Sequence, residues 1–138
     1  MGTGILDGYK VLDFTQALAG PTTTRYLGQM GAEIIKVEIA PNGDISRAIP
    51  YMRDGRSAYY VQQNRGKKSI CVDAKKPGGL AILKDLLLKV DVLVQNFTPG
   101  AKFWINTSIL GTNPLRIARP AGFFGSRQRL FLPRFCWT

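Results

Sequence analysis

Apolar residues follow two different spacings along the first hundred residues of the chain. Short, partly β-branched runs (KVLDFT, AEIIKVE, SICVD and DVLVQ) predict strands, which we place at residues 11–14, 34–37, 70–72 and 92–94. The segments PTTTRYLGQM and PGGLAILKDLLLKV predict helices, at 21–30 and 80–90. Strands that alternate with helices in this way predict parallel pairing and right-handed crossovers. We therefore predict an α/β fold, a Rossmann-like parallel sheet with helices on both faces.

Particular residues mark where the helices should begin and end. Pro21 suits the first position of helix 21–30, and Gly31 suits the left-handed turn that ends it. Ser57 is placed to cap a short helix with the sequence AYYVQQN. Pro77 opens the last helix, whose core face is predicted from helical spacing to be Leu80, Leu83, Leu87 and Val90. Residues 39–56 are rich in Pro, Gly, Asp and Arg and are predicted to form a loop.

Charge and hydrophobic period both change near residue 100. The chain has 19 basic and 9 acidic residues, yet residues 101–138 contain six basic residues and no acidic one. No regular period continues there, and we place no element in this segment. We therefore predict two parts, a Rossmann-like segment 1–100 and a basic tail 101–138 that has diverged or is translated out of the ancestral frame. The net charge of +10 raises nucleic-acid binding as a function, but the basic residues do not share one periodic face, so no nucleic-acid partner is expected.

Several classes of protein are disfavoured by composition. The chain has no histidine, which excludes His-ligated metals and His-based catalysis, and no metal site is expected. Its two cysteines are too few for a disulfide scaffold and do not form a CxxC pair. No apolar run reaches the ~20 residues of a membrane span, and no secretory signal is visible. A cytoplasmic protein without a membrane partner is the expectation.

The first turn of the predicted sheet lies where open α/β sheets bind ligands. Residues 16–20 (QALAG) follow a strand and precede a helix, so free backbone N–H groups should meet a ligand there. A dinucleotide site needs three glycines at such a turn, and only Gly20 is present. Glu38, at the end of the next strand, stands where a ribose-binding acid could be. An ordinary tight turn remains the alternative for a single glycine.

Three further segments are predicted to lie at or near strand ends on the same edge of the sheet. PNGDISR is either an anion-facing loop or a surface turn with an Asp44–Arg47 pair. NRGKKS presents two lysines that either face phosphates or form a solvated basic turn. VQNFTPG ends a strand with an amide and an aromatic ring, which suit an adenine base, or it is a turn with a half-buried Phe. Together they suggest a pocket for a polyanion that carries an aromatic base.

Five blocks in order, LDGYKVLDFTQALAGP, GAEIIKVE, NGDISR, NRGKKSICVD and NFTPG, closely resemble the N-terminal part of the family III CoA-transferases. That family includes formyl-CoA transferase, carnitine CoA-transferase and the bile-acid-inducible transferases. The resemblance implies that the glycine-poor turn receives coenzyme A, as part of an acyl-CoA substrate, and that a carboxylic acid is the acceptor. Family members form interlocked homodimers of much longer chains.

The resemblance also implies which residues contact CoA. The segments that match the family's contacts are the first turn, the end of the third strand and the segment after the fourth: Leu18, Ala19, Val72, Asp73, Ala74, Lys75, Asn96, Phe97 and Thr98. Some positions depart from the formyl branch. Leu18 replaces a glutamine near the thioester, which argues against a formyl/oxalate specificity. Ile39 and Trp104 replace basic CoA contacts.

The family's catalytic aspartate forms an enzyme anhydride and then an aspartyl-CoA thioester, and its position lies beyond the matched blocks. No acidic residue follows Asp91, so no catalytic residue is assigned here. The sequence is thus interpreted as a truncated CoA-transferase whose segment 1–100 holds part of the CoA site and does not turn over alone. The alternatives are an α-methylacyl-CoA racemase, a branch of the same family, and a non-catalytic CoA- or nucleotide-binding module.

Overall fold

The computed structural model describes residues 4–95 and 116–118. Within them, the elements follow one another in the order β1 (Lys10–Asp13), α1 (Ala19–Gln29), β2 (Glu33–Ile39), the 3₁₀ helix η1 (Ile45–Ala48), β3 (Met52–Arg53), β4 (Arg56–Ser57), α2 (Ala58–Asn64), β5 (Lys68–Val72), α3 (Pro77–Leu87), β6 (Val92–Val94) and β7 (Arg116–Ala118). Strands and helices alternate as the sequence predicts.

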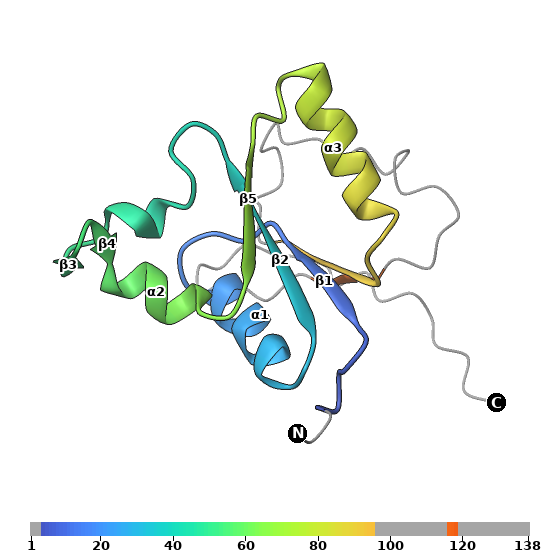
Figure 1. The fold of residues 1–138 in the computed structure, drawn as a ribbon, viewed down its shortest axis with the longest axis horizontal. Coiled ribbons are helices and arrows are strands. Elements are labelled where there is room, and N and C mark those ends of the chain that lie inside the picture. The colour runs from blue at the N-terminus through green and yellow to red at the C-terminus, as the bar shows by residue number, and fades with distance from the viewer. Residues whose placement is uncertain (1–3, 96–115, 119–138) are drawn as a thin grey trace, which may run out of the picture.

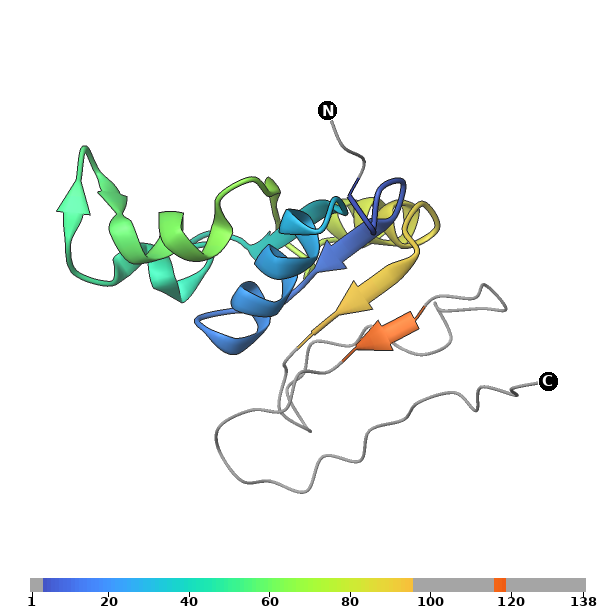
Figure 2. The same cartoon turned by 90° about the horizontal axis from the view of Figure 1, so that it is seen from below.

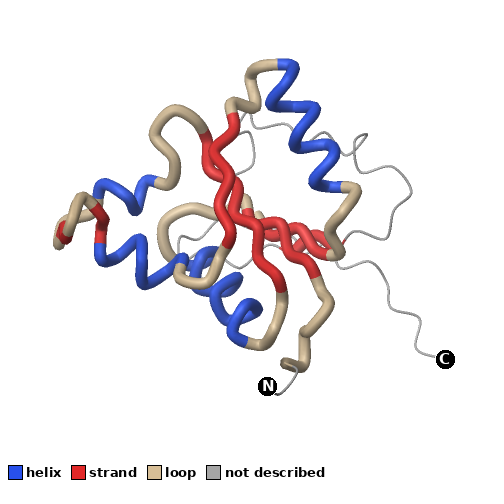
Figure 3. The backbone as a smooth tube through the Cα atoms, viewed as in Figure 1, coloured by secondary structure: helices blue, strands red, loops and turns tan. Residues whose placement is uncertain are grey.

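Five of the strands form one sheet in the order β5-β2-β1-β6-β7, and every neighbouring pair is parallel. The helix α3 lies on one side of this sheet, and α1 and α2 lie on the other (Figure 1, Figure 3). The predicted α/β class, the four predicted strands and the two-sided helix cover are therefore confirmed. Because all five strands are parallel, their carboxyl ends meet at one edge of the sheet.

The sheet separates two apolar clusters. On the α3 side, Leu83 and Leu87 pack against strand residues that include Leu12, Phe14 and Val37. Val90, which lies beyond the end of α3, packs against the same cluster, and Leu80 is half-buried. The predicted core positions are therefore confirmed at Leu83, Leu87 and Val90. On the α1 side, a smaller cluster of buried residues is formed by Val11, Ala32, Ile34 and Val94.

Most of the predicted helix ends agree with the structure. Ser57 caps α2 by accepting a hydrogen bond from the Tyr60 N–H, and Pro77 is at the start of α3. Gly31 has a φ of 108°, in the region that favours glycine, and follows α1 as predicted. The start of α1 was misplaced, because the helix begins at Ala19 and Pro21 is its third residue. Proline is tolerated there because the N–H groups of a first turn have no partner within the helix.

The prediction of a plain loop for residues 39–56 is wrong in part. β2 continues to Ile39, η1 follows, and β3 pairs with β4 in an antiparallel hairpin. Asp54 and Gly55 both have positive φ, at 50° and 70°, which is the backbone of a two-residue type I′ turn. The Asp-Gly pair is a common signature of that turn.

One strand of the basic tail lies within the described residues. β7 pairs with β6 in parallel at the edge of the sheet (Figure 2). The sequence predicts no element after residue 100, so this strand is a correction to that prediction. The rest of the tail is outside the described residues, and its divergence or frameshift stays a prediction. No helix of the described residues is long and apolar enough to cross a membrane.

Candidate functional site

The carboxyl edge of the sheet brings two of the three predicted contact segments onto one side of the molecule. Leu18 is half-exposed in the turn between β1 and α1, and Ala19 begins α1. Val72 to Lys75 follow β5, which is separated from β1 by β2 alone. Two strand spacings are about 10 Å, a distance that one extended ligand can span. Asn96, Phe97 and Thr98 lie outside the described residues.

The turn between β1 and α1 has an uncommon backbone. Ala17 has a φ of 66°, a left-handed conformation that a residue with a Cβ seldom adopts. Gly20 packs so closely on the residues that follow β1 that a Cβ there would overlap the Thr15 side chain. The single glycine of this turn therefore serves the contact of α1 with the sheet, and the turn's shape must be held by other residues.

Beneath the turn, Asp13 at the end of β1 is fully buried and bound on both carboxylate oxygens. Oδ1 accepts from the Thr15 N–H and hydroxyl, at 2.9 and 2.5 Å, and Oδ2 accepts from the Thr24 hydroxyl at 2.6 Å. The Lys67 ammonium lies 3.0 Å from Oδ2 and also donates to Pro21 O and Asn64 Oδ1. Burial lowers the pKa of Lys67, and the charge of Asp13 opposes this.

A second ion pair joins β2 to the loop that follows it. Lys36 Nζ lies 2.7 Å from Asp44 Oδ2, and the two side chains are 1% and 0% exposed. The other oxygen of Asp44 accepts from Ser46 N, at 2.8 Å, and from Ser46 Oγ, at 2.7 Å. Burial acts to raise the pKa of Asp44, but Lys36 and the Ser46 hydrogen bonds outweigh it and keep that pKa below its usual value.

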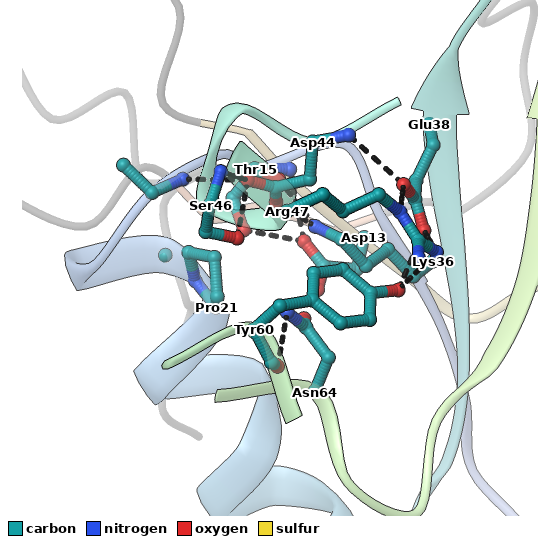
Figure 4. A network of polar contacts seen from close by, with 12 residues as sticks. Asp13, Thr15, Pro21, Lys36, Glu38, Asp44, Ser46, Arg47, Tyr60 and Asn64 are labelled. Carbon is teal, nitrogen blue, oxygen red and sulfur yellow. Dashed lines mark hydrogen bonds and ion pairs between the residues drawn. The ribbon is translucent and has the colours of Figure 1, made fainter. Parts of the chain in front are cut away.

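A third cluster surrounds Glu38 near the end of β2 (Figure 4). Arg47 binds the carboxylate with two N–H groups, at 2.6 and 2.7 Å, and the hydroxyls of Tyr60 and Ser69 donate to it, both at 2.6 Å. Burial acts to raise the pKa of Glu38, but the hydrogen bonds from Arg47, Ser69 and Tyr60 hold it well below its usual range. Burial and the hydrogen bond to Glu38 raise the pKa of Tyr60 to about 12.

These three clusters decide several alternatives left open by the sequence. The Asp44–Arg47 pair does not form, since Asp44 pairs with Lys36 and Arg47 with Glu38. The two lysines of NRGKKS differ, because Lys67 is buried on Asp13 whereas Lys68 is exposed to solvent and pairs with Glu33. They therefore do not form a phosphate-facing pair. Glu38 has its oxygens occupied by protein donors, so it offers no carboxylate to a ribose.

The segment after β5 forms a compact turn. Val72 is buried in the α3-side core, and the Asp73 carboxylate accepts a hydrogen bond from the Lys75 N–H at 3.0 Å. Lys75 itself is exposed, so its ammonium group is available to solvent at the carboxyl edge. Within the described residues there is no group of three or more acidic or cysteine side chains that could hold a metal ion.

Comparison with known proteins decides the family. The model of the CoA-transferase family III matches residues 6–112, most of the chain. This chain belongs to that family. The match reaches beyond residue 100, at which the sequence predicts that the basic tail begins. The boundary between segment 1–100 and the tail 101–138 therefore stays a prediction.

Curated relatives and solved structures agree with this family III membership. The chain is 48% identical over 96 residues to succinyl-CoA:glutarate CoA-transferase of Homo sapiens, and 43% identical over 99 residues to formyl-CoA:oxalate CoA-transferase of Bradyrhizobium sp. (strain ORS 278). These alignments cover 69% and 71% of this chain but only 22% and 23% of those relatives. The chain therefore spans less than a quarter of their length.

The fold is shared with crystal structures of the same group. Rv3272 from M. tuberculosis, in its orthorhombic form, superposes with a TM-score of 0.70 at 35% identity, over 86% of this chain and 35% of that one. A CAIB/BAIF family protein from Brucella suis gives a TM-score of 0.65 at 36% identity, over 70% of this chain and 26% of that one. The candidate site therefore lies at the carboxyl edge of a sheet that this chain shares with these structures.

Proposed function

We propose that this chain supplies the amino-terminal part of the CoA site of a family III CoA-transferase. The complete reaction moves CoA from an acyl-CoA to a carboxylic acid. The observation that carries the proposal is the family match over residues 6–112, which includes every strand end at which a CoA contact is predicted. The curated relatives are named for an acyl-CoA donor and a dicarboxylic acid acceptor, which supports this substrate class.

CoA contacts are proposed at Leu18, Ala19, Val72 to Lys75, and Asn96 to Thr98. The first two lie at the start of α1, an 11-residue helix whose free N–H groups favour a phosphate or another electron-rich group. Lys75 adds an exposed positive charge on the same edge, which suits a phosphate as a point charge. The half-exposed Leu18 side chain offers an apolar contact.

The nucleophile of the reaction is proposed to lie outside residues 4–95. Attack on a thioester needs a carboxylate that is free to approach it. At the carboxyl edge, Asp13, Glu38 and Asp44 are each buried and paired with Lys67, Arg47 and Lys36, and Asp73 accepts from the Lys75 N–H within the proposed contact segment. We therefore propose that this chain alone binds CoA weakly and does not complete the transfer.

Calorimetry with CoA tests the binding site. The wild-type chain should bind weakly, and Asn96→Ala and Lys75→Ala should each lower the affinity further. Lys84→Ala is the matched control, because Lys84 is an exposed residue of α3 outside the predicted contact segments. Tight binding that neither Asn96→Ala nor Lys75→Ala changes would refute the assignment.

Mass spectrometry tests the absence of turnover. After incubation with succinyl-CoA or formyl-CoA, the intact chain should keep its unmodified mass. A covalent aspartyl-CoA adduct on this chain would show that it contains the nucleophile after all.

A further inference from the structure

The residues that lead from β1 to the proposed CoA turn are held at two points by one buried ion pair. Lys36 Nζ donates to the Thr15 carbonyl at 2.8 Å, and Asp44 Oδ1 accepts from the Ala17 N–H at 3.3 Å. Lys36 and Asp44 are themselves 2.7 Å apart and almost completely buried. The pair therefore fixes the backbone on both sides of Gln16, directly before Leu18.

The Ala17 contact matters because the conformation of Ala17 is unfavourable for an L-residue. A left-handed φ of 66° brings a Cβ close to the following carbonyl, so it persists only where the surroundings impose it. Asp44 is suited to impose it, because its Oδ1 is already oriented by the N–H and hydroxyl of Ser46. The Asp44 N–H in turn donates to Glu38 Oε2 at 2.9 Å, which joins the loop to β2 (Figure 4).

We propose that Lys36 and Asp44 are positioning residues for the CoA site: they hold the β1–α1 turn in the conformation that presents Leu18 and Ala19 to CoA. Neither side chain is exposed, so neither contacts CoA itself. The link to CoA in this inference rests on the proposed function. The role of the pair in the conformation of the turn concerns the protein without CoA. Lys36 lies within a buried strand and Asp44 within a distant loop, so the turn takes its shape from residues outside its own segment.

The test uses the full chain with both charges removed together. Lys36→Met combined with Asp44→Leu takes away the donor to Thr15 and the acceptor for Ala17 without leaving a single charge buried. We expect this paired variant to bind CoA at least ten-fold more weakly than wild type in calorimetry. We also expect amide exchange at the Ala17 N–H, slow in the unliganded wild type, to become fast.

Ala17→Gly provides a rescue that a general loss of stability would not produce. Glycine adopts positive φ without the Cβ penalty. Adding Ala17→Gly to the paired variant should therefore raise its affinity for CoA about five-fold. Arg47→Met combined with Glu38→Gln is the matched control. It removes the neighbouring ion pair without leaving a single charge buried, and the amide oxygen introduced at position 38 can still accept from the Asp44 N–H. Its affinity for CoA should stay within two-fold of wild type.

Each result decides between the claims. Wild-type affinity in a folded paired variant, or fast exchange at Ala17 in wild type, overturns the positioning role and leaves the proposed function standing. No CoA binding by wild type, together with a protected Ala17 N–H, refutes the proposed function and the CoA part of this inference.

If the paired variant does not fold, Ser46→Ala replaces it, since it frees Asp44 Oδ1 from the Ser46 hydroxyl. It should weaken CoA binding two- to three-fold and speed Ala17 exchange, and wild-type values in both would overturn the role.

Discussion

The two faces of the sheet are built from different side chains, although the same strands supply both. On the α3 face, the strand residues Leu12, Phe14, Val37, Val72 and Leu93 are all apolar and buried. On the α1 face, Val94 of β6 is apolar and buried, and Val11 is in register with Ile34. Two residues further on, the paired positions are Asp13 and Lys36, both buried.

This change along one face indicates a division of roles. Apolar packing on the α3 face holds the sheet together without prescribing the shape of any loop. Buried ion pairs seldom add stability over apolar residues of similar volume, so the charges on the α1 face are better explained by what they hold in place. They lie at the carboxyl edge, and they contact the β1–α1 turn, η1 and α2.

The largest effect should follow from breaking the buried pair on one side only. Lys36→Met leaves Asp44 charged and buried without a cation, and we expect the free energy of unfolding to fall by about 3–5 kcal/mol in urea titrations followed by circular dichroism. Adding Asp44→Leu should recover most of that loss, because the α1 face then resembles the α3 face. A single variant within about 1 kcal/mol of wild type would mean that the pair behaves like a surface pair.

A cavity on the α3 face should cost nearly as much stability but leave binding unchanged. Leu83→Ala removes a buried side chain from the larger cluster, and we expect a loss of about 2–5 kcal/mol. CoA affinity, measured by calorimetry well below the melting temperature, should stay within two-fold of wild type. A loss of affinity as large as that expected for the Lys36 and Asp44 variants would show that the two faces are not separable.

The sequence predicted the apolar parts of this comparison better than the polar ones. Strand and helix positions follow from local periods, and the capping role of Ser57 depends on the residues beside it. The partners of Lys67 and Arg47 could not be read in this way, because Lys67 pairs with Asp13, 54 positions earlier. A signal was present, since Lys36 stands between the apolar residues Ile35 and Val37 of the strand EIIKVEI, and a buried lysine needs an acid.

Acid should weaken the α1 face and spare the α3 face. The pKa values of Glu38 and Asp44 are lowered by folding, so their stabilisation is fully present above the unfolded values of about 4.3 and 3.9. It is lost as the pH falls through the lower folded values. Unfolding free energies should therefore be flat between about pH 7 and 5 and decline below about 4.5. Glu38→Gln should flatten that decline, whereas Leu83→Ala should shift the whole curve without changing its shape.

The smallest effect should come from an ion pair on the outer surface of the α3 side. Lys89 Nζ lies 2.6 Å from Asp85 Oδ2, closer than the buried Lys36–Asp44 pair, but the two side chains are 63% and 61% exposed. Water screens such a pair and both side chains lose rotamer freedom, so Lys89→Met should change the free energy of unfolding by about 0.5 kcal/mol or less. Urea titrations at low and high salt provide the check, and the difference between Lys89→Met and wild type should shrink further as salt is added. A loss approaching that of Lys36→Met would mean that distance, and not burial, sets the strength of these pairs. The contrast between the two faces would then no longer explain why the charges lie beneath the turn.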